Sequence, residues 1–259
     1  MSAPLPAVLV CDAPWKPKDQ LPGPGRGAAS NYDVIATADL CKLERPAMAE
    51  RHVLLFWRIA AMIEDAAQVL DAWGYVAASE IVWCKLRICS TCIGVKRVIA
   101  HRVRGEVVLV PADESMLTDS DRVCPRCHGR GGTPHTGLGH YVRAAHEVCI
   151  IARPKRGRAP ERLDKGVSSV FAAPMLVDVD GVLPGGRKGG LVHSAKPDAF
   201  YALAEQLYPG PRAEMFGRRA RAGWTVQGHE AGKLDTIAET FRAWPARVRA
   251  ERLGLQVAR

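Results

Sequence analysis

The chain has 259 residues, of which 47% are hydrophobic, and its 36 Lys and Arg against 27 Asp and Glu give a formal net charge of +9. This length accommodates one large α/β domain with a sizeable core, or one such domain with a small inserted module. No apolar run approaches the roughly 18 residues of a membrane span, and the first four residues lack the features of a signal peptide, so we expect a soluble cytoplasmic protein without membrane contact. The basic charge favours a polyanionic partner such as nucleic acid, although solubility alone would also account for it.

The first predicted strand is the apolar run of residues 7–10, which ends at Asp12. In open α/β sheets, ligands bind at the carboxyl ends of strands, and the X-Pro bond that follows Asp12 favours an extended conformation. Asp12, the Ala13 or Pro14 carbonyl and the Trp15 indole together suit a flat base with an exocyclic amine, because two oxygens accept the amine hydrogens while the indole stacks. The alternative interpretation is that Asp12 begins a turn and Trp15 packs on the core.

Alternating strands and helices follow. Residues 16–31 contain three glycines and three prolines and predict a loop that closes over a substrate strand, with Tyr32 as a second stacking ring or a packing residue. The apolar spacing then predicts a helix over 37–43 capped by Thr37, a buried strand over 52–57, a helix over 58–73 stopped by Gly74, and a strand over 75–85. This order predicts a parallel sheet with right-handed crossovers.

Two CxxC pairs interrupt the alternation of predicted strands and helices. Cys89 and Cys92 form the first pair, and Cys124 and Cys127 form the second after 31 intervening residues. Two such knuckles bring four thiolates to one Zn²⁺ at about 2.3 Å each, and a site closed by four sulfurs is structural. A redox pair or unrelated cysteines are the alternatives. The inserted module, residues 86–136, includes a predicted hairpin over 104–111 and basic residues that either contact a phosphate backbone or form a solvated face.

The remaining chain predicts further elements of an α/β fold. These are a strand over 146–152, an extended segment over 167–177, a helix over 197–208 with Pro197 in its first turn, short strands over 213–217 and 224–228, and an amphipathic helix over 233–244.

The order of motifs resembles the MT-A70 family of S-adenosylmethionine-dependent adenine N6-methyltransferases, and most of all its bacterial and phage DNA-modifying members. The motifs are Asp12-Ala13-Pro14-Trp15, Trp73-Gly74-Tyr75 with Trp83-Cys84-Lys85, Gly139-His140-Tyr141 with His146-Glu147, His193-Ser194-Ala195-Lys196-Pro197, Glu214-Met215-Phe216-Gly217-Arg218, and residues 224–230. The resemblance covers nearly all of the chain apart from the zinc-binding module, and it implies a Rossmann-like methyltransferase sheet in permuted order. The predicted domain is therefore residues 1–259, into which the zinc-binding module is inserted.

The resemblance also implies roles for individual residues. The catalytic base grip is Asp12, Ala13, Pro14 and Trp15; the acceptor pocket includes Tyr32, Glu147 and Lys196; the cofactor S-adenosylmethionine lies against Glu214, Phe216, Arg218, His229 and Glu230. The expected reaction is direct methyl transfer to adenine N6 in flipped-out DNA bases. RNA as the acceptor, or a non-catalytic nucleic-acid-binding subunit with a vestigial fold, are the alternatives.

Two positions depart from the family pattern. Ala13 stands where the family usually has proline, which removes a fixed φ worth about 1 kcal/mol of preorganisation but keeps the carbonyl. His229 stands in place of the more usual asparagine in the expected ribose contact. Because Asp12 is retained, the sequence predicts an active enzyme.

Overall fold

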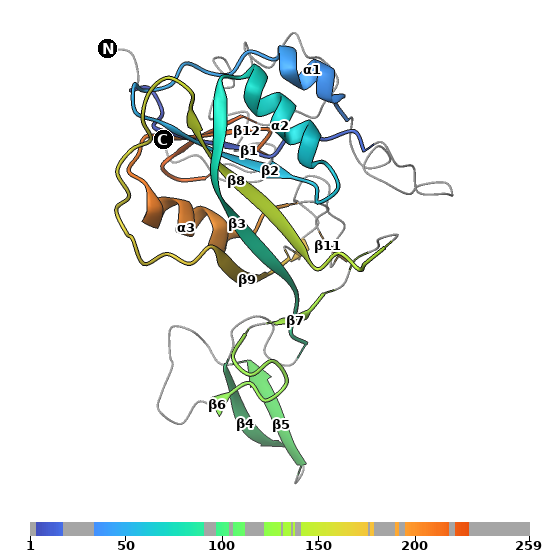
Figure 1. The fold of residues 1–259 in the computed structure, drawn as a ribbon. Coiled ribbons are helices and arrows are strands. Elements are labelled where there is room, and N and C mark those ends of the chain that lie inside the picture. The colour runs from blue at the N-terminus through green and yellow to red at the C-terminus, as the bar shows by residue number, and fades with distance from the viewer. Residues whose placement is uncertain are drawn as a thin grey trace, which may run out of the picture.

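The computed structural model describes residues 4–17, 34–90, 97–103, 106–111, 122–130, 132–135, 137, 141–175, 177–178, 190–191, 195–217 and 221–227. Within these residues, eight strands form one mixed sheet in the order β13-β12-β1-β2-β8-β3-β7, with β9 paired to β3 (Figure 1). The strands are β1 (Val8–Cys11), β2 (Val53–Arg58), β3 (Tyr75–Ile88), β7 (Gly132–Pro134), β8 (His146–Pro154), β9 (Val170–Pro174), β12 (Arg212–Met215) and β13 (Trp224–Gln227).

Helices cover both faces of this sheet. α1 (Thr37–Lys42) and α2 (Ile63–Ala72) lie on one face, and α3 (Asp198–Leu207) lies on the other (Figure 1). Alternate residues of β1 point to opposite faces of the sheet. Leu9 packs into the cluster that contains α2 residues, and Val10 packs into the cluster that contains α3 residues. Burial on both faces explains why this strand is a continuous apolar run. The expected α/β fold class is confirmed, and the large sheet fits a Rossmann-like methyltransferase fold.

The sheet is not wholly parallel, so that expectation is wrong in part. β1 pairs in parallel with β2 and with β12, and β12 pairs in parallel with β13. β8, however, lies between β2 and β3 and is antiparallel to both. The described part of the chain between β3 and β8 contains strands and turns but no helix, and antiparallel neighbours need no crossover helix.

Several helix boundaries also differ from the expected ones. α2 begins at Ile63 rather than residue 58, and α1 has Ala36 rather than Thr37 at its N-cap. The Thr37 hydroxyl instead donates to Asp65 Oδ1 at 2.7 Å, which supplies a partner for a buried carboxylate of α2. Pro197 is the N-cap of α3, one position before the expected first turn. The expected helix over 233–244 lies outside the described residues.

The inserted segment forms a small sheet of its own. β4 (Arg97–Val103) pairs antiparallel with β5 (Glu106–Pro111) on one side and with β6 (Arg122–Val123) on the other. The hairpin is therefore longer than predicted, since its first strand begins at Arg97 rather than at residue 104. In Figure 1 the three strands extend from the end of β3, away from the helices. A further pair joins β10 (Val177–Asp178) to β11 (Gly190–Leu191). None of the helices described is both long and apolar enough to cross a membrane.

Candidate active site

The carboxyl ends of the parallel strands gather side chains from distant parts of the chain. Asp12 follows β1 directly, and Glu147 lies at the start of the antiparallel β8, which brings it to the same edge of the sheet. Lys196 directly precedes the N-cap of α3. β1 has β2 on one side and β12 on the other, so the strand order reverses at β1. Such a switch point is where doubly wound sheets bind ligands.

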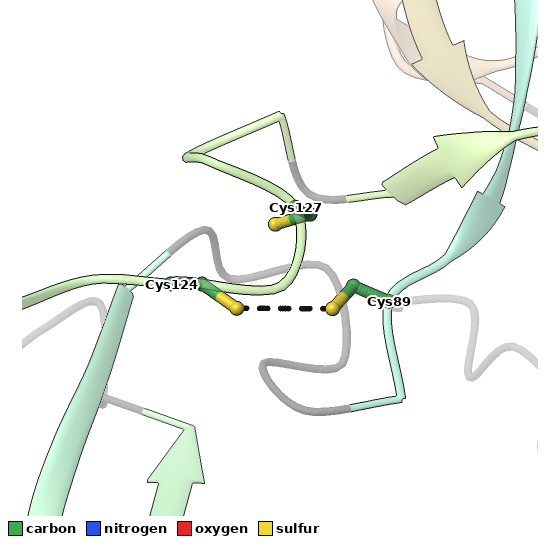
Figure 2. Close-up of side chains that lie close together, drawn as sticks. All are labelled: Cys89, Cys124 and Cys127. Atoms are coloured by element: carbon green, nitrogen blue, oxygen red, sulfur yellow. Dashed lines mark hydrogen bonds between the residues drawn. The ribbon is translucent and has the colours of Figure 1, made fainter.

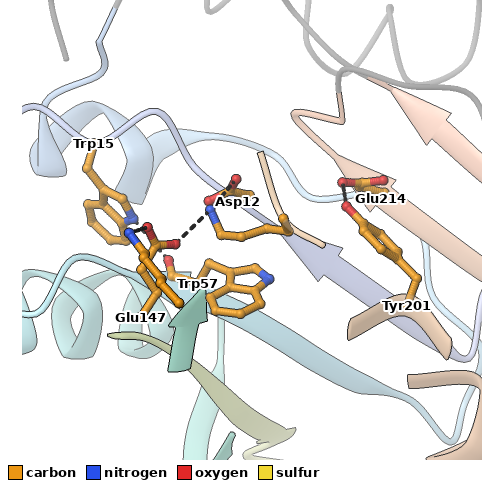
Figure 3. Close-up of polar contacts among 8 residues, drawn as sticks. Asp12, Trp15, Trp57, Glu147, Tyr201 and Glu214 are labelled. Carbon is orange, nitrogen blue, oxygen red and sulfur yellow. Dashed lines mark hydrogen bonds and ion pairs between the residues drawn. The ribbon is translucent and has the colours of Figure 1, made fainter. Parts of the chain in front are cut away.

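Four charged groups form a continuous chain at this edge. Lys196 Nζ lies 2.7 Å from Asp12 Oδ2 and 3.1 Å from Glu147 Oε2, and Lys85 Nζ lies 2.5 Å from Glu147 Oε1. Figure 3 shows Asp12 and Glu147 turned toward one another, with dashed lines marking the contacts. The charges alternate along the chain, so each inner group lies between two groups of opposite sign.

Burial and neighbouring charges act in opposite directions on the inner pair. Burial alone would lower the pKa of Lys196, but the carboxylates of Asp12 and Glu147 outweigh it and raise that pKa. Burial alone would raise the pKa of Glu147, but the ammonium groups of Lys196 and Lys85 lower it. Both inner groups are therefore charged at neutral pH. The Lys196 side chain is 4% exposed and that of Asp12 is 20% exposed, so within this pair Asp12 is the group accessible to a ligand.

The two main-chain carbonyls of the predicted base grip already accept hydrogen bonds. The Ala13 oxygen accepts from the Trp15 N–H at 2.9 Å, and the Pro14 oxygen accepts from the Ile35 N–H at 2.8 Å. A carbonyl oxygen has two lone pairs, so either oxygen retains the capacity to accept an amine hydrogen. These bonds fix the segment after Asp12 against a neighbouring part of the chain.

Trp15 has the packing role that the alternative interpretation gave it. Its side chain is 3% exposed, its ring centroid lies 5.3 Å from that of Phe56, and its Nε1–H donates to the Trp57 carbonyl at 3.0 Å. The indole thus anchors the segment after β1 to the end of β2. Stacking on a base stays a prediction.

The predicted cofactor side contains a second buried acid. Glu214 of β12 is 4% exposed and accepts a hydrogen bond from the Tyr201 hydroxyl of α3 at 2.5 Å (Figure 3). After it, Phe216 has a φ of 62°, which is rare for a bulky residue. A Cβ on Gly217 would lie 2.4 Å from Val226 Cγ1 and 2.8 Å from Glu214 Cδ, so glycine is required there. The sharp turn at the end of β12 thus depends on specific residues.

Several predicted site residues lie outside the described part of the chain. They are Tyr32 of the acceptor pocket, Arg218, His229 and Glu230 of the cofactor side, and Cys92 of the metal site. Their roles stay predictions.

No family model matches the chain, but comparison with known proteins finds similar adenosine methyltransferases. The N(6)-adenosine-methyltransferase MT-A70-like of Arabidopsis thaliana is 22% identical over 91% of this chain and 25% of its own length. The N(6)-adenosine-methyltransferase catalytic subunit METTL3 of Homo sapiens is 22% identical over 92% of this chain and 31% of its own length. The N(6)-adenosine-methyltransferase MT-A70-like protein of Drosophila melanogaster is 22% identical over 86% of this chain and 26% of its own length.

Over most of its length, the chain is similar to N6-adenosine-methyltransferases of the MT-A70 type. It spans about a quarter to a third of the length of the curated relatives that it matches.

Three of the four predicted metal ligands lie together. The Sγ atoms of Cys89, Cys124 and Cys127 are within 4.8 Å of one another, and all three residues are buried (Figure 2). Cys89 Sγ and Cys124 Sγ are 3.8 Å apart, far more than the roughly 2.05 Å of a disulfide bond. Two sulfurs on a tetrahedral zinc with bonds of about 2.3 Å are about 3.8 Å apart, so the spacing fits a metal.

The turn around the second cysteine pair has the shape of a metal knuckle. The His128 N–H donates to the Cys124 carbonyl at 2.8 Å, and the Arg130 N–H donates to the Cys127 carbonyl at 3.0 Å. His128 and Gly129 have φ values of 51° and 74°. These bonds turn the chain tightly, which places both sulfurs on one side of the loop.

Two polar residues of the candidate site are not predicted by the sequence. Lys85 belongs to one of the motifs but has no predicted role, yet it contacts Glu147. This contact depends on the pairing of β3 with β8, in which Trp83 is the register partner of Glu147 and Lys85 shares the face of Trp83, so no local pattern indicates it. Tyr201, the donor to Glu214, lay inside a predicted helix among apolar residues, and no local pattern distinguished it.

Replacing Glu214 with glutamine is expected to remove a pH dependence of stability. Burial raises the pKa of Glu214 to about 7, from 4.5. The folded state therefore favours the protonated acid, and this stability is complete below pH 4.5 and is lost as the pH rises to about 7. Urea unfolding between pH 5 and 8 should show a loss of about 2–3 kcal/mol in the wild type that the Gln variant lacks. Exposed Glu64→Gln is the control, and identical pH profiles for wild type and Glu214→Gln would refute the assignment.

Proposed function

We propose that this chain transfers a methyl group from S-adenosylmethionine to the N6 amine of adenine in DNA. The observation that supports it most is the Asp12 carboxylate, partly exposed at the switch point of the sheet and held there by buried Lys196. Curated relatives of the family are named N(6)-adenosine-methyltransferases, which supports the same chemistry for this chain. The DNA-modifying members that the motifs resemble favour DNA as the acceptor.

The proposed mechanism depends on how Asp12 holds the acceptor amine. The N6 lone pair is delocalised into the adenine ring, so the amine is a weak nucleophile. Asp12 and the Ala13 or Pro14 carbonyl accept its two N–H bonds, which orients the nitrogen and favours a tetrahedral geometry with the lone pair toward the methyl group. As the N–C bond forms, positive charge develops on nitrogen, and the carboxylate stabilises it. One amine proton then leaves to Asp12 or to water.

The carboxyl edge of β1 and β12 suits the cofactor. Bound S-adenosylmethionine would supply a methyl group on a sulfonium sulfur, and the rest of the cofactor would leave as a neutral thioether. Phe216 and Gly217 turn the chain sharply at the end of β12, beside the strand that carries Asp12. Glu214, Phe216, Arg218, His229 and Glu230 are the residues proposed to hold the adenosine.

RNA is the second candidate acceptor, because the names of the curated relatives refer to adenosine, a ribonucleoside. Labelled S-adenosylmethionine, incubated separately with duplex DNA, single-stranded DNA and RNA of one sequence, tests both. We expect N6-methyladenine in the DNA after nuclease digestion. Methylation of RNA alone would move the proposal to the second candidate. Nucleic-acid binding without methylation of any acceptor would support the non-catalytic interpretation instead.

We also propose that Cys89, Cys92, Cys124 and Cys127 bind one structural zinc ion. The three described thiols are buried together at a spacing that fits tetrahedral coordination. Cys124→Ser is expected to lower bound zinc from one ion per chain to nearly none and to lower the melting temperature. Cys41→Ser, in α1 and outside the cluster, is the matched control. Metal analysis of the purified proteins measures the first effect, and an undiminished zinc content in Cys124→Ser would refute the site.

A further inference from the structure

The inserted segment continues directly from the strand that carries Lys85. Cys89 comes four residues after Lys85, a distance of about 13 Å in an extended strand. β7 returns along the same strand, with Ile88 paired to Gly132 and Leu86 paired to Pro134. The next residue, His135, donates its N–H to the Lys85 carbonyl at 3.0 Å. The cysteine knuckle is therefore joined through two adjacent strands to the acceptor side of the candidate active site.

The cofactor side lies at the opposite end of the sheet. β12 and β13 occupy one end of the strand order and β3 and β7 the other, with β1, β2 and β8 between them. The inserted segment is thus adjacent to the part of the site assigned to the acceptor, away from the part assigned to the cofactor. A role in cofactor binding would not explain this position.

The described surface of the knuckle is basic. Residues 122–135 contain no Asp or Glu. The arginines of this segment and of the adjoining end of β3 are exposed, and within the described residues none forms an ion pair with a carboxylate; they are Arg87, Arg122, Arg126 and Arg130. Elsewhere in the described chain, Arg51, Arg58 and Arg221 pair with carboxylates, whereas Arg156 and Arg158 form no ion pair. Within the described residues, the charge of the four knuckle arginines is thus not balanced by an ion pair.

Two of these arginines are also held in place. Arg87 Nε donates to His135 Nδ1 at 3.0 Å, and Arg130 Nε donates to the Cys127 carbonyl at 3.1 Å. Each bond restricts the guanidinium through Nε and does not use its two terminal nitrogens. A preorganised fork of this kind is suited to phosphate oxygens.

We propose that this arginine-bearing knuckle binds the phosphate backbone of the acceptor DNA beside the target adenine. The inference rests on the proposed function for the position of the adenine. About 13 Å beyond Lys85 corresponds to about four base pairs of duplex, at 3.4 Å per step. Duplex DNA is stiff over this length, so a duplex seated at Asp12 with its axis along the end of β3 reaches the knuckle without bending.

The test measures binding alone, so it does not depend on methyl transfer. The probe is a fluorescein-labelled DNA duplex of about 30 base pairs, roughly 100 Å long, titrated with the full-length protein over a range of salt concentrations. The variant is Arg122→Gln with Arg126→Gln, two side chains without a structural hydrogen bond in the described residues. The control is Arg156→Gln with Arg158→Gln, two exposed arginines that follow β8 at the opposite edge of the sheet. Zinc content is measured in all three proteins.

The knuckle variant is expected to bind the duplex at least about tenfold more weakly, with the slope of log Kd against log salt reduced by about 1.8 for two lost phosphate contacts. The control should bind like the wild type, and zinc should be unchanged in both. Equal binding by the knuckle variant, or an equal loss in the control, would overturn the proposal. The same titration is run with labelled RNA of the same sequence, and a loss confined to the RNA would overturn the choice of DNA. If the wild-type protein transfers no methyl group but the arginine substitutions still weaken duplex binding, the result would contradict the proposed function and leave the binding proposal intact.

Discussion

Replacing Asp12 with asparagine is expected to lower the rate of methyl transfer by about 100-fold to 1,000-fold, the range seen when one oriented electrostatic group is removed from an active site. The Asn side chain keeps the size of Asp and one acceptor oxygen but loses the negative charge. The charge that develops on the amine is then uncompensated, while Lys196 keeps its contact with Glu147. Transfer of labelled methyl groups to the preferred acceptor measures the effect.

Asp39→Asn is the matched control, because Asp39 lies on α1 with a side chain that is 41% exposed. Asp39→Asn should unfold like the wild type, and Asp12→Asn should lose less stability than Lys196→Met, because Lys196 keeps its contact with Glu147. A transfer rate in Asp12→Asn equal to that of Asp39→Asn would remove Asp12 from the mechanism. A large drop in stability in Asp12→Asn alone would show that its role is to hold Lys196.

Replacing Lys196 with methionine is expected to cost about 3–5 kcal/mol in the free energy of unfolding, as for other buried ion pairs from which one partner is removed. Methionine fills similar space but leaves Asp12 and Glu147 facing one another without the ammonium between them. Chemical denaturation at pH 7 measures the loss, and Lys42→Met, at a side chain that is 76% exposed, is the control with a negligible expected effect.

A second variant separates lost charge balance from lost packing. Adding Glu147→Gln to Lys196→Met removes one of the two opposed carboxylates, so it should recover part of the stability. The pH dependence gives a further check, since the pKa of Glu147 is lowered in the folded state. Its contribution is present above the unfolded value of 4.5 and is lost as the pH falls through the folded value, so wild type and Lys196→Met should converge in acid. A constant difference between them at all pH values would instead indicate a packing defect.

The local elements of the fold were predictable because each depends on nearby residues. Apolar runs predicted β1, β2 and β8, and helical spacing with a flanking proline predicted α3. The position of β8 between β2 and β3 was not predictable, since it depends on pairing between residues 62 to 98 positions apart in sequence, which leaves no local pattern.

The candidate site was likewise predictable in its individual residues but not in their contacts. Motif resemblance named Asp12, Glu147 and Lys196 separately, and the structure brings them into one chain of contacts. It did not reveal that Lys85 belongs to that chain, or that the Trp15 indole is buried, because burial on a given face depends on which strands become neighbours. The spacing of the cysteines was informative alone, since tetrahedral coordination restricts the separations within each pair.

The cysteine-containing segment leaves from β3 and returns to pair with β3 through β7, and the chain then enters β8, the antiparallel neighbour of β3. Its entry and exit are therefore adjacent, as in a β-hairpin whose turn has been replaced by a folded unit. An insertion at such a position leaves the register of the flanking strands unchanged, so the unit can be lost or exchanged without displacing Lys85 or Glu147. If the segment contacts the acceptor as proposed, this contact can change between related chains while the arrangement of Asp12, Lys196 and Glu147 stays the same.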